Sequence, residues 1–165
     1  MRKMLLTLAS LLVVSLLVFF PSVYAADPPS LDIAVYMDCS AIAYMDIDDS
    51  EMSLKGYGLG TFMMSGDFSD SGVAAQPWWE VETDIYTGIG EMKGKIGIKG
   101  TKGALGISFE GTLTPGEPGY SVCAGEWTTV YGTGSYEGLS GQGTFTTVTN
   151  LETFEVIGTF VGLES

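Results

Sequence analysis

Apolar and polar side chains alternate with a period of two from Leu31 onward. Acidic and hydroxyl side chains occupy most of the intervening positions, with Tyr36 and Tyr44 among them. A period of two is typical of a β-strand. A straight strand of this length would extend about 55 Å, so we expect a bend or a bulge within it. The apolar face consists of Leu31, Ile33, Val35, Met37, Cys39, Ala41, Ala43, Met45 and Ile47.

The same alternation recurs in shorter pieces, separated by turn-forming residues, at 58–64, 81–87, 95–99, 105–113, 127–131, 143–148 and 154–160. About eight strands at this spacing are typical of an all-β sandwich or barrel. All 23 glycines follow residue 55 and several fall within strands, where glycine marks sharp coiling. The sequence therefore predicts a closed antiparallel barrel, forming a single domain over residues 26–165.

The first 25 residues have the composition of a secretory signal peptide. Arg2 and Lys3 precede an apolar run from 4 to 20, Pro21 follows, and small residues suit cleavage after Ala25. The alternative is an uncleaved membrane anchor, since the apolar run is only slightly short of a membrane span. We expect export to the periplasm or the cell exterior, with membrane contact only through this segment.

The chain is strongly acidic, with 7 Lys+Arg against 20 Asp+Glu and a net charge of −13. Removal of the signal peptide takes away two cations and no acid, which gives 5 − 20 = −15. Nucleic acid is therefore excluded as a partner, because its phosphates require clustered cations. The cluster Lys93, Lys95, Lys99 and Lys102 is expected on the exposed face of one strand, with a weak anion site as the alternative.

The two cysteines, Cys39 and Cys123, both follow the signal peptide. In an oxidising compartment we expect a disulfide between them. Two buried thiols that never meet are the alternative, since sequence spacing does not show proximity.

Motifs for catalysis or metal binding are weak. The chain has no histidine, which excludes a Ser-His-Asp triad and histidine-ligated zinc. "DSG" at 70–72 is similar to the catalytic turn of aspartic proteases, but it has no second copy and is interpreted as a surface turn. "DIDDSE" at 46–51 spaces its oxygens like a calcium-binding loop but lacks the glycine that such a loop needs at its sixth position. We expect no catalytic residue, cofactor or metal from these motifs.

The pair Trp78 and Trp79 lies in "QPWWEVE". In an extended chain neighbouring side chains point to opposite faces, so one tryptophan should face the interior and the other the exterior. The exterior one is a candidate contact for a sugar or a partner, and packing alone is the alternative.

The stretch "VYGTGSYEGLSGQGTF" at 130–145 contains five glycines. It is followed by a strand, not a helix, so a phosphate-binding loop does not fit. We expect Gly132 and Gly134 to adopt positive φ in a turn, and Tyr136 and Leu139 to plug one end of the barrel.

"GEWTTVYGTGSYEGLSGQGTFT" resembles the signature hairpin of the allene-oxide-cyclase-like barrels, which include dirigent-type proteins. "FEGTL" and "GTFVG" are similar to its flanking strands, so the likeness covers roughly 52–162. The resemblance implies an eight-stranded barrel with an apolar cavity, often oligomeric, and it transfers no catalytic residue. The matching positions are Gly132, Thr133, Gly134, Tyr136, Gly138, Leu139, Gly141 and Gly143.

Three functions follow as hypotheses. The first is an exported, non-enzymatic barrel that binds a small apolar ligand or acts as an interaction module. The second, implied by the resemblance alone, is a cofactor-free isomerase or dirigent-like coupling protein, which needs an acid and a tyrosine to converge in the cavity. The third is an eight-stranded outer-membrane barrel, against which stand the cysteines, the glycines and the short strands.

Overall fold

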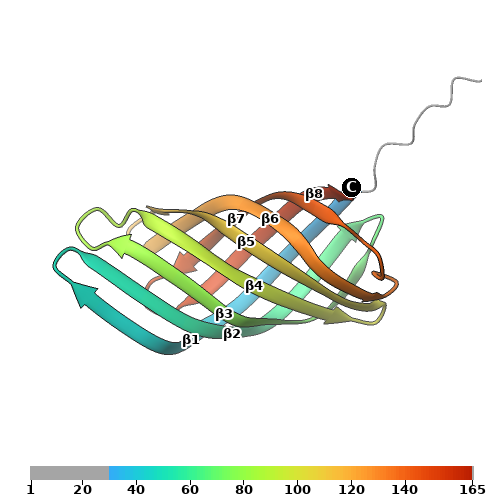
Figure 1. Cartoon of the computed structure of the whole chain (residues 1–165), viewed down its shortest axis with the longest axis horizontal. Coiled ribbons are helices and arrows are strands. Elements are labelled where there is room, and N and C mark those ends of the chain that lie inside the picture. The colour runs from blue at the N-terminus through green and yellow to red at the C-terminus, as the bar shows by residue number, and fades with distance from the viewer. Residues whose placement is uncertain (1–29, 165) are drawn as a thin grey trace, which may run out of the picture.

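The computed structural model describes residues 30–164, which form an all-β protein (Figure 1). The expected signal peptide at 1–25 lies outside the described residues. The eight strands are β1 (Ser30–Asp48), β2 (Glu51–Gly66), β3 (Asp70–Asp84), β4 (Gly90–Gly100), β5 (Gly103–Pro115), β6 (Tyr120–Gly134), β7 (Gly141–Asn150) and β8 (Glu155–Glu164). The described residues contain no helix long and apolar enough to cross a membrane.

Each strand pairs antiparallel with the next, and β8 pairs with β1, which closes the barrel. The predicted closed antiparallel barrel of eight strands is therefore confirmed. β1 begins and β8 ends at the same end of the barrel (Figure 1). We call this the plugged end, because the β6–β7 loop closes it, and we call the opposite end the mouth.

The interior is apolar, as the alternating pattern predicts. Phe109, Phe145 and Phe160 form an aromatic cluster, with ring centroids 5.2 Å apart for Phe109 and Phe145 and 5.3 Å apart for Phe145 and Phe160. The larger buried side chain of Trp127 lies on β6 opposite Phe109 in the strand register, and buried Tyr136 lies in the β6–β7 loop at the plugged end. An outer-membrane barrel has an apolar exterior and a polar interior. The apolar interior of this barrel argues against that alternative, whereas its exposed apolar side chains do not, and the strands are longer than the sequence pieces suggested.

The long first strand contains the expected irregularity. The register between β1 and β2 shifts between Asp38 and Ala41 and again between Ile42 and Tyr44. Ile42, and not Ala41 as the pattern predicted, packs against the core. A bulge inserts one extra residue and reverses the facing of the side chains that follow. The prediction of a bulge is confirmed, and the prediction of one unbroken face is wrong at Ala41.

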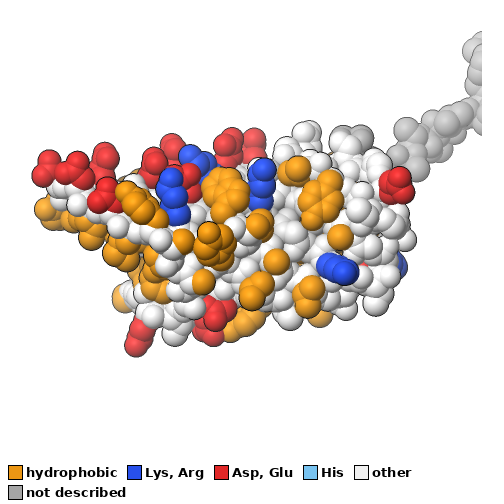
Figure 2. All heavy atoms as spheres, turned by 60° about the horizontal axis from the view of Figure 1, so that its bottom comes forward, with side chains coloured by type: hydrophobic (Ala, Val, Ile, Leu, Met, Phe, Trp, Pro, Cys, Tyr) orange, Lys and Arg blue, Asp and Glu red, His pale blue; other side chains and the backbone are white. Residues whose placement is uncertain are grey.

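After the second register shift, the odd-numbered side chains near the end of β1 again face inward, as they do from Leu31 to Cys39. Met45 pairs with Leu54 and Ile47 pairs with Met52, so these side chains share the inner face of the β1–β2 hairpin. This hairpin extends past the ends of the later strands at the mouth (Figure 1). Met45 and Ile47 are consequently 54% and 56% exposed. Figure 2 shows hydrophobic side chains along one side of this projecting end and acidic side chains along the other.

Glycine in the β6–β7 connection is required for two different reasons. Gly134 and Gly138 have φ of 65° and 80°, which side chains disfavour. Gly132 has no positive φ among the described backbone outliers, so the expectation for this residue is wrong. Its requirement is space, because an added Cβ would lie 1.8 Å from the carbonyl oxygen of Tyr136.

We expect Gly132→Ala to lower the free energy of unfolding by about 1–3 kcal/mol or more, the usual cost of overpacking. Gly97→Ala is the matched control, because its Cβ would have nothing closer than 3.4 Å. Thermal unfolding followed by circular dichroism measures both. Equal Tm values for the two variants would contradict the role of close approach at Gly132.

Candidate functional site

An apolar cavity of about 400 Å³ lies at the mouth of the barrel. All eight strands contribute at least one residue to its lining. Its walls are mainly aliphatic and sulfur-containing side chains on inward positions of the strands, among them Leu54, Val81, Met92, Leu113 and Val156. A concave, mostly apolar site of this size is the usual form of a small-molecule site.

The cavity exists because side-chain size changes along the barrel axis. β5 runs from the plugged end to the mouth, so Phe109 lies deeper in the barrel than Leu113. On β7 and β8, Phe145 and Phe160 likewise lie deeper than Thr149 and Val156, which line the cavity. The cluster of Phe109, Phe145 and Phe160 fills the deeper half of the barrel, and the smaller side chains that follow on these strands toward the mouth leave space.

An acid and a tyrosine both line the cavity, but they do not form a pair. Oδ1 of Asp84 accepts hydrogen bonds from the backbone N–H and the hydroxyl of Thr87, at 2.7 and 2.9 Å, and from the N–H of Tyr86. The hydrogen bonds from Thr87 lower the pKa of Asp84. The carboxylate therefore organises the β3–β4 turn, and no hydrogen bond joins it to Tyr120 within the described part of the chain.

The two adjacent tryptophans point to opposite sides of β3, as predicted. Trp79 lines the cavity and is 3% exposed, whereas Trp78 is 37% exposed and borders an outer groove with Lys93 and Ser108. The ring of Trp79 lies over Gly56, where an added Cβ would be 2.5 Å from it. A ligand or partner contact at Trp78 stays a prediction.

Irregular pairing surrounds Trp79. The β2–β3 register shifts between Gly56 and Gly58, and the β3–β4 register shifts between Ala75 and Trp78. Bulges are common beside functional sites, where they redirect a side chain. Neither shift is visible as a pattern in the sequence, so sequence analysis missed the cavity wall that they shape.

The two cysteines are free thiols, and the expected disulfide is wrong. Both side chains point into the barrel, but β1 and β6 are not neighbouring strands. Sγ of Cys39 lies 3.3 Å from Oε1 of Gln76, to which it donates a hydrogen bond. Burial raises the pKa of Cys39 to about 12, with a contribution from Asp38, and burial raises the pKa of Cys123 to about 11.

We expect two titratable thiols in the denatured, non-reduced protein. In the native protein both should react slowly near neutral pH, because a raised pKa keeps the thiolate fraction low until strongly alkaline pH. Ellman's reagent, with and without denaturant, measures both states. A count of zero thiols in denaturant would show that Cys39 and Cys123 form a disulfide.

The plugged end is held by a hydrogen-bond network around Asp70. Its carboxylate accepts from the hydroxyl of Tyr136 at 2.8 Å, the hydroxyl of Thr101 at 2.9 Å, and the backbone N–H groups of Ser71 and Lys102 at 2.9 and 3.1 Å. Burial alone would raise the pKa of Asp70, but the hydrogen bonds from Tyr136, Lys102, Ser71 and Thr101 hold it well below its usual value. Asp70 thus joins the β2–β3 turn, the β4–β5 turn and the β6–β7 loop.

The glycine-rich hairpin predicted as a structural motif forms this plug. Tyr136 is fully buried and Leu139 is 8% exposed. Phe68 packs beside Tyr136, with ring centroids 6.5 Å apart. Thr133 accepts a hydrogen bond from the N–H of Ala104, and Gly141 begins β7. The prediction that Tyr136 and Leu139 plug the barrel end is confirmed by their burial. The interpretation of "DSG" as a surface turn is wrong, because these residues begin β3, and Asp70 accepts a hydrogen bond from Tyr136 of the plug.

We expect Asp70→Asn to destabilise the protein at neutral pH, because an amide replaces one acceptor oxygen with a donor facing other donors. A lowered folded-state pKa stabilises the protein above the unfolded-state pKa of about 3.9, and this stabilisation is lost as the pH falls below it. The difference in free energy of unfolding between wild type and Asp70→Asn should therefore become smaller below about pH 4. Urea unfolding across this range measures it, with Asp48→Asn at the mouth as control. A difference that does not change with pH would contradict this role.

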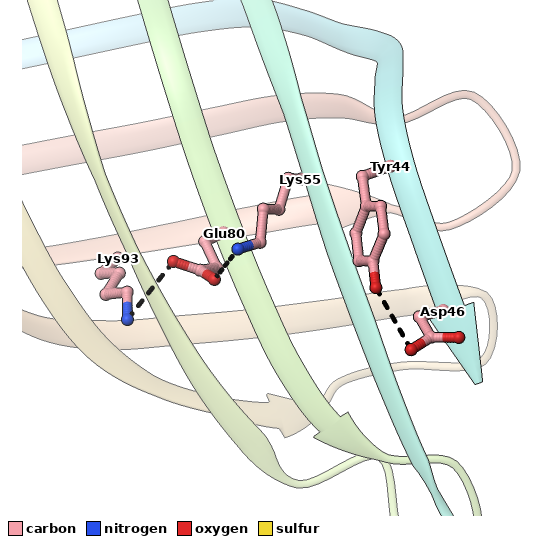
Figure 3. Close-up of polar contacts among 5 residues, drawn as sticks. All are labelled: Tyr44, Asp46, Lys55, Glu80 and Lys93. Carbon is pink, nitrogen blue, oxygen red and sulfur yellow. Dashed lines mark hydrogen bonds and ion pairs between the residues drawn. The ribbon is translucent and has the colours of Figure 1, made fainter. Parts of the chain in front are cut away.

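The outer face carries an ion-pair ladder across β2, β3 and β4. Glu80 contacts Nζ of Lys55 at 2.6 Å and Nζ of Lys93 at 3.3 Å, and Tyr44 donates to Asp46 nearby (Figure 3). The hydrogen bond with Lys55 lowers the pKa of Glu80. The ladder lies directly behind the cavity wall, since Glu80 alternates with the inward Trp79 and Val81. Lys93, Lys95 and Lys99 point outward from β4 as expected, and Lys102 lies in the following turn.

Exposed apolar side chains gather on the outside of β8, β1, β2 and β3 around Thr61. The strand register places Thr61 between Tyr36 and Val73, and it places Ile157 beside Tyr36. Leu59 and Met63 flank Thr61 along β2 and are 72% and 67% exposed. The oligomer implied by the resemblance stays a prediction.

Residues 30–164 contain no group of three or more potential metal ligands arranged to hold an ion. The acidic stretch "DIDDSE" forms the end of β1 and the tight turn into β2.

No protein-family model matches the chain, and no curated protein matches it. The likeness to allene-oxide-cyclase-like barrels therefore stays a prediction.

Proposed function

We propose that the protein binds a small apolar molecule in the mouth cavity and does not transform it. The observation that carries this proposal is the cavity of about 400 Å³, which is lined by residues from all eight strands, most of them apolar, and is continuous with the mouth. Removing apolar surface from water contributes about 0.8 kcal/mol for each buried CH₂ group. A chain of several carbons would therefore gain enough to offset the usual cost of association.

The closed topology of the barrel supports the same function. The mouth turns are joined to strands that close on themselves, and the opposite end is filled by Tyr136 and the aromatic cluster. A ligand would enter a site whose walls are already formed, so little ordering is needed on binding. The expected signal peptide would place this binding outside the inner membrane.

The enzymatic alternative is less well supported. An isomerase or coupling protein needs a general acid or base aimed at the ligand. Asp84 is the acid among the cavity-lining residues, and its Oδ1 is occupied by Thr87 and Tyr86 of its own turn. The geometry thus favours binding over catalysis.

We expect the protein to bind the neutral apolar dye N-phenyl-1-naphthylamine and enhance its fluorescence. Ser121 lines the cavity and is 7% exposed, so Ser121→Phe should fill part of the site and weaken binding by about tenfold or more. Fluorescence titration measures the dissociation constants.

Ser65→Phe provides the matched control, because Ser65 is exposed on the outer side of β2, away from the mouth. This variant should bind the dye as wild type does. Absence of dye binding by the wild type, or equal weakening by both substitutions, would overturn the proposed function.

A further inference from the structure

The indole N–H of Trp79 is a buried donor without a protein partner. Two buried side-chain polar atoms in the described part of the chain lack a hydrogen bond, Nε1 of Trp79 and Oγ1 of Thr147. Of these two residues, Trp79 lines the mouth cavity and Thr147 does not. Trp127, also buried, shows the usual arrangement, because its Nε1–H donates to the carbonyl oxygens of Thr144 and Val161 at 3.1 and 3.3 Å.

A buried donor without an acceptor is unfavourable, and such groups in native proteins call for an explanation. The indole N–H has no acceptor capacity, so only an acceptor can satisfy it. In this mostly apolar cavity wall, a ligand oxygen that accepts from Trp79 would gain a hydrogen bond with little competition from water. The position of the donor therefore selects for the chemistry of the ligand.

Charge around the cavity restricts that chemistry further. Asp84 is the one ionisable acid in the lining, and no lysine or arginine belongs to it. A carboxylate ligand would bring a second negative charge into an apolar site without a cation, which is costly. The overall net charge of −13 acts in the same direction. The site therefore favours a neutral acceptor such as a carbonyl or an ether oxygen.

The direction of the strands orients such a ligand. β3 runs from the plugged end to the mouth, so Trp79 lies deeper than Val81 and Thr83. Beyond them the inner face continues onto the projecting β1–β2 hairpin, where Met45 and Ile47 pair with Leu54 and Met52. A ligand with its acceptor at Trp79 would therefore extend its apolar part toward the mouth and along this hairpin.

We propose that the ligand is a neutral, elongated apolar molecule with a hydrogen-bond acceptor at its inner end, which accepts from Nε1–H of Trp79. This inference rests on the proposed function, since it requires a ligand in the mouth cavity. Trp79 is then the residue that distinguishes an oxygen-bearing ligand from a hydrocarbon of the same shape.

The first test uses the wild-type protein and three probes of similar length, 2-nonanone, nonane and nonanoate. In proton–nitrogen NMR spectra, 2-nonanone should move the indole N–H signal of Trp79 downfield, and nonane should move it much less. The signal of Trp127 is the internal control, because its N–H is already bonded. If 2-nonanone displaces the dye but shifts the Trp79 signal no more than nonane does, the inference is wrong and the proposed function stands.

The second test compares Trp79→Phe with Trp78→Phe, the same substitution on the outer face. We compare the ratio of the dissociation constants of 2-nonanone and nonane in each protein. Trp79→Phe should raise this ratio by about fivefold, the factor expected for the loss of one hydrogen bond. Trp78→Phe should leave the ratio unchanged. An unchanged ratio in Trp79→Phe would contradict the role of the indole, and nonanoate binding as tightly as 2-nonanone would contradict the preference for a neutral ligand.

The two proposals fail in different ways. If the wild type binds neither the dye nor any probe, the proposed function fails. If Trp79→Phe does not fold, the NMR comparison in the wild type still decides the inference.

Discussion

The structure depends on the closure of the sheet by pairing between β1 and β8. This pairing runs without a register shift from Ser30–Leu163 to Asp38–Glu155. It satisfies the backbone groups of both edge strands, which would otherwise be open to pairing with another chain. Closure also defines an inside, so that a simple alternation of side chains becomes a buried core on one face and a solvent-exposed surface on the other.

A closed barrel has limited interior space, and the residues that share it must differ in size. Large aromatic rings lie against glycines of adjacent strands, as the ring of Phe109 lies against Gly94 and the ring of Trp79 against Gly56. An added Cβ at either glycine would come within 2.7 Å of the ring. The mid-strand glycines thus allow large rings to pack inside the barrel, both in the aromatic cluster around Phe109 and at Trp79 in the cavity wall.

Much of the fold was accessible from the sequence, because it follows from local patterns. The alternation from Leu31 to Cys39 identified the inner face of β1, and the glycine spacing around Tyr136 identified the plug. The disulfide prediction failed because the distance between β1 and β6 depends on the closed topology, which the spacing of Cys39 and Cys123 does not contain. Gly132 was misinterpreted for a related reason, since its constraint comes from a contact with Tyr136 and not from its own φ.

The candidate site was harder to predict because it is formed by irregularities. Three neighbouring strand pairs, β1–β2, β2–β3 and β3–β4, contain register shifts, and those of β2–β3 and β3–β4 flank Trp79. Each shift changes which side chain faces inward, so the inward position of Trp79 rather than Trp78 depends on the bulges before it. A regular strand pattern predicts that one of the two tryptophans is buried but does not say which. Because that choice places the indole of Trp79 in the cavity wall, the bulges shape the candidate site as well as the barrel.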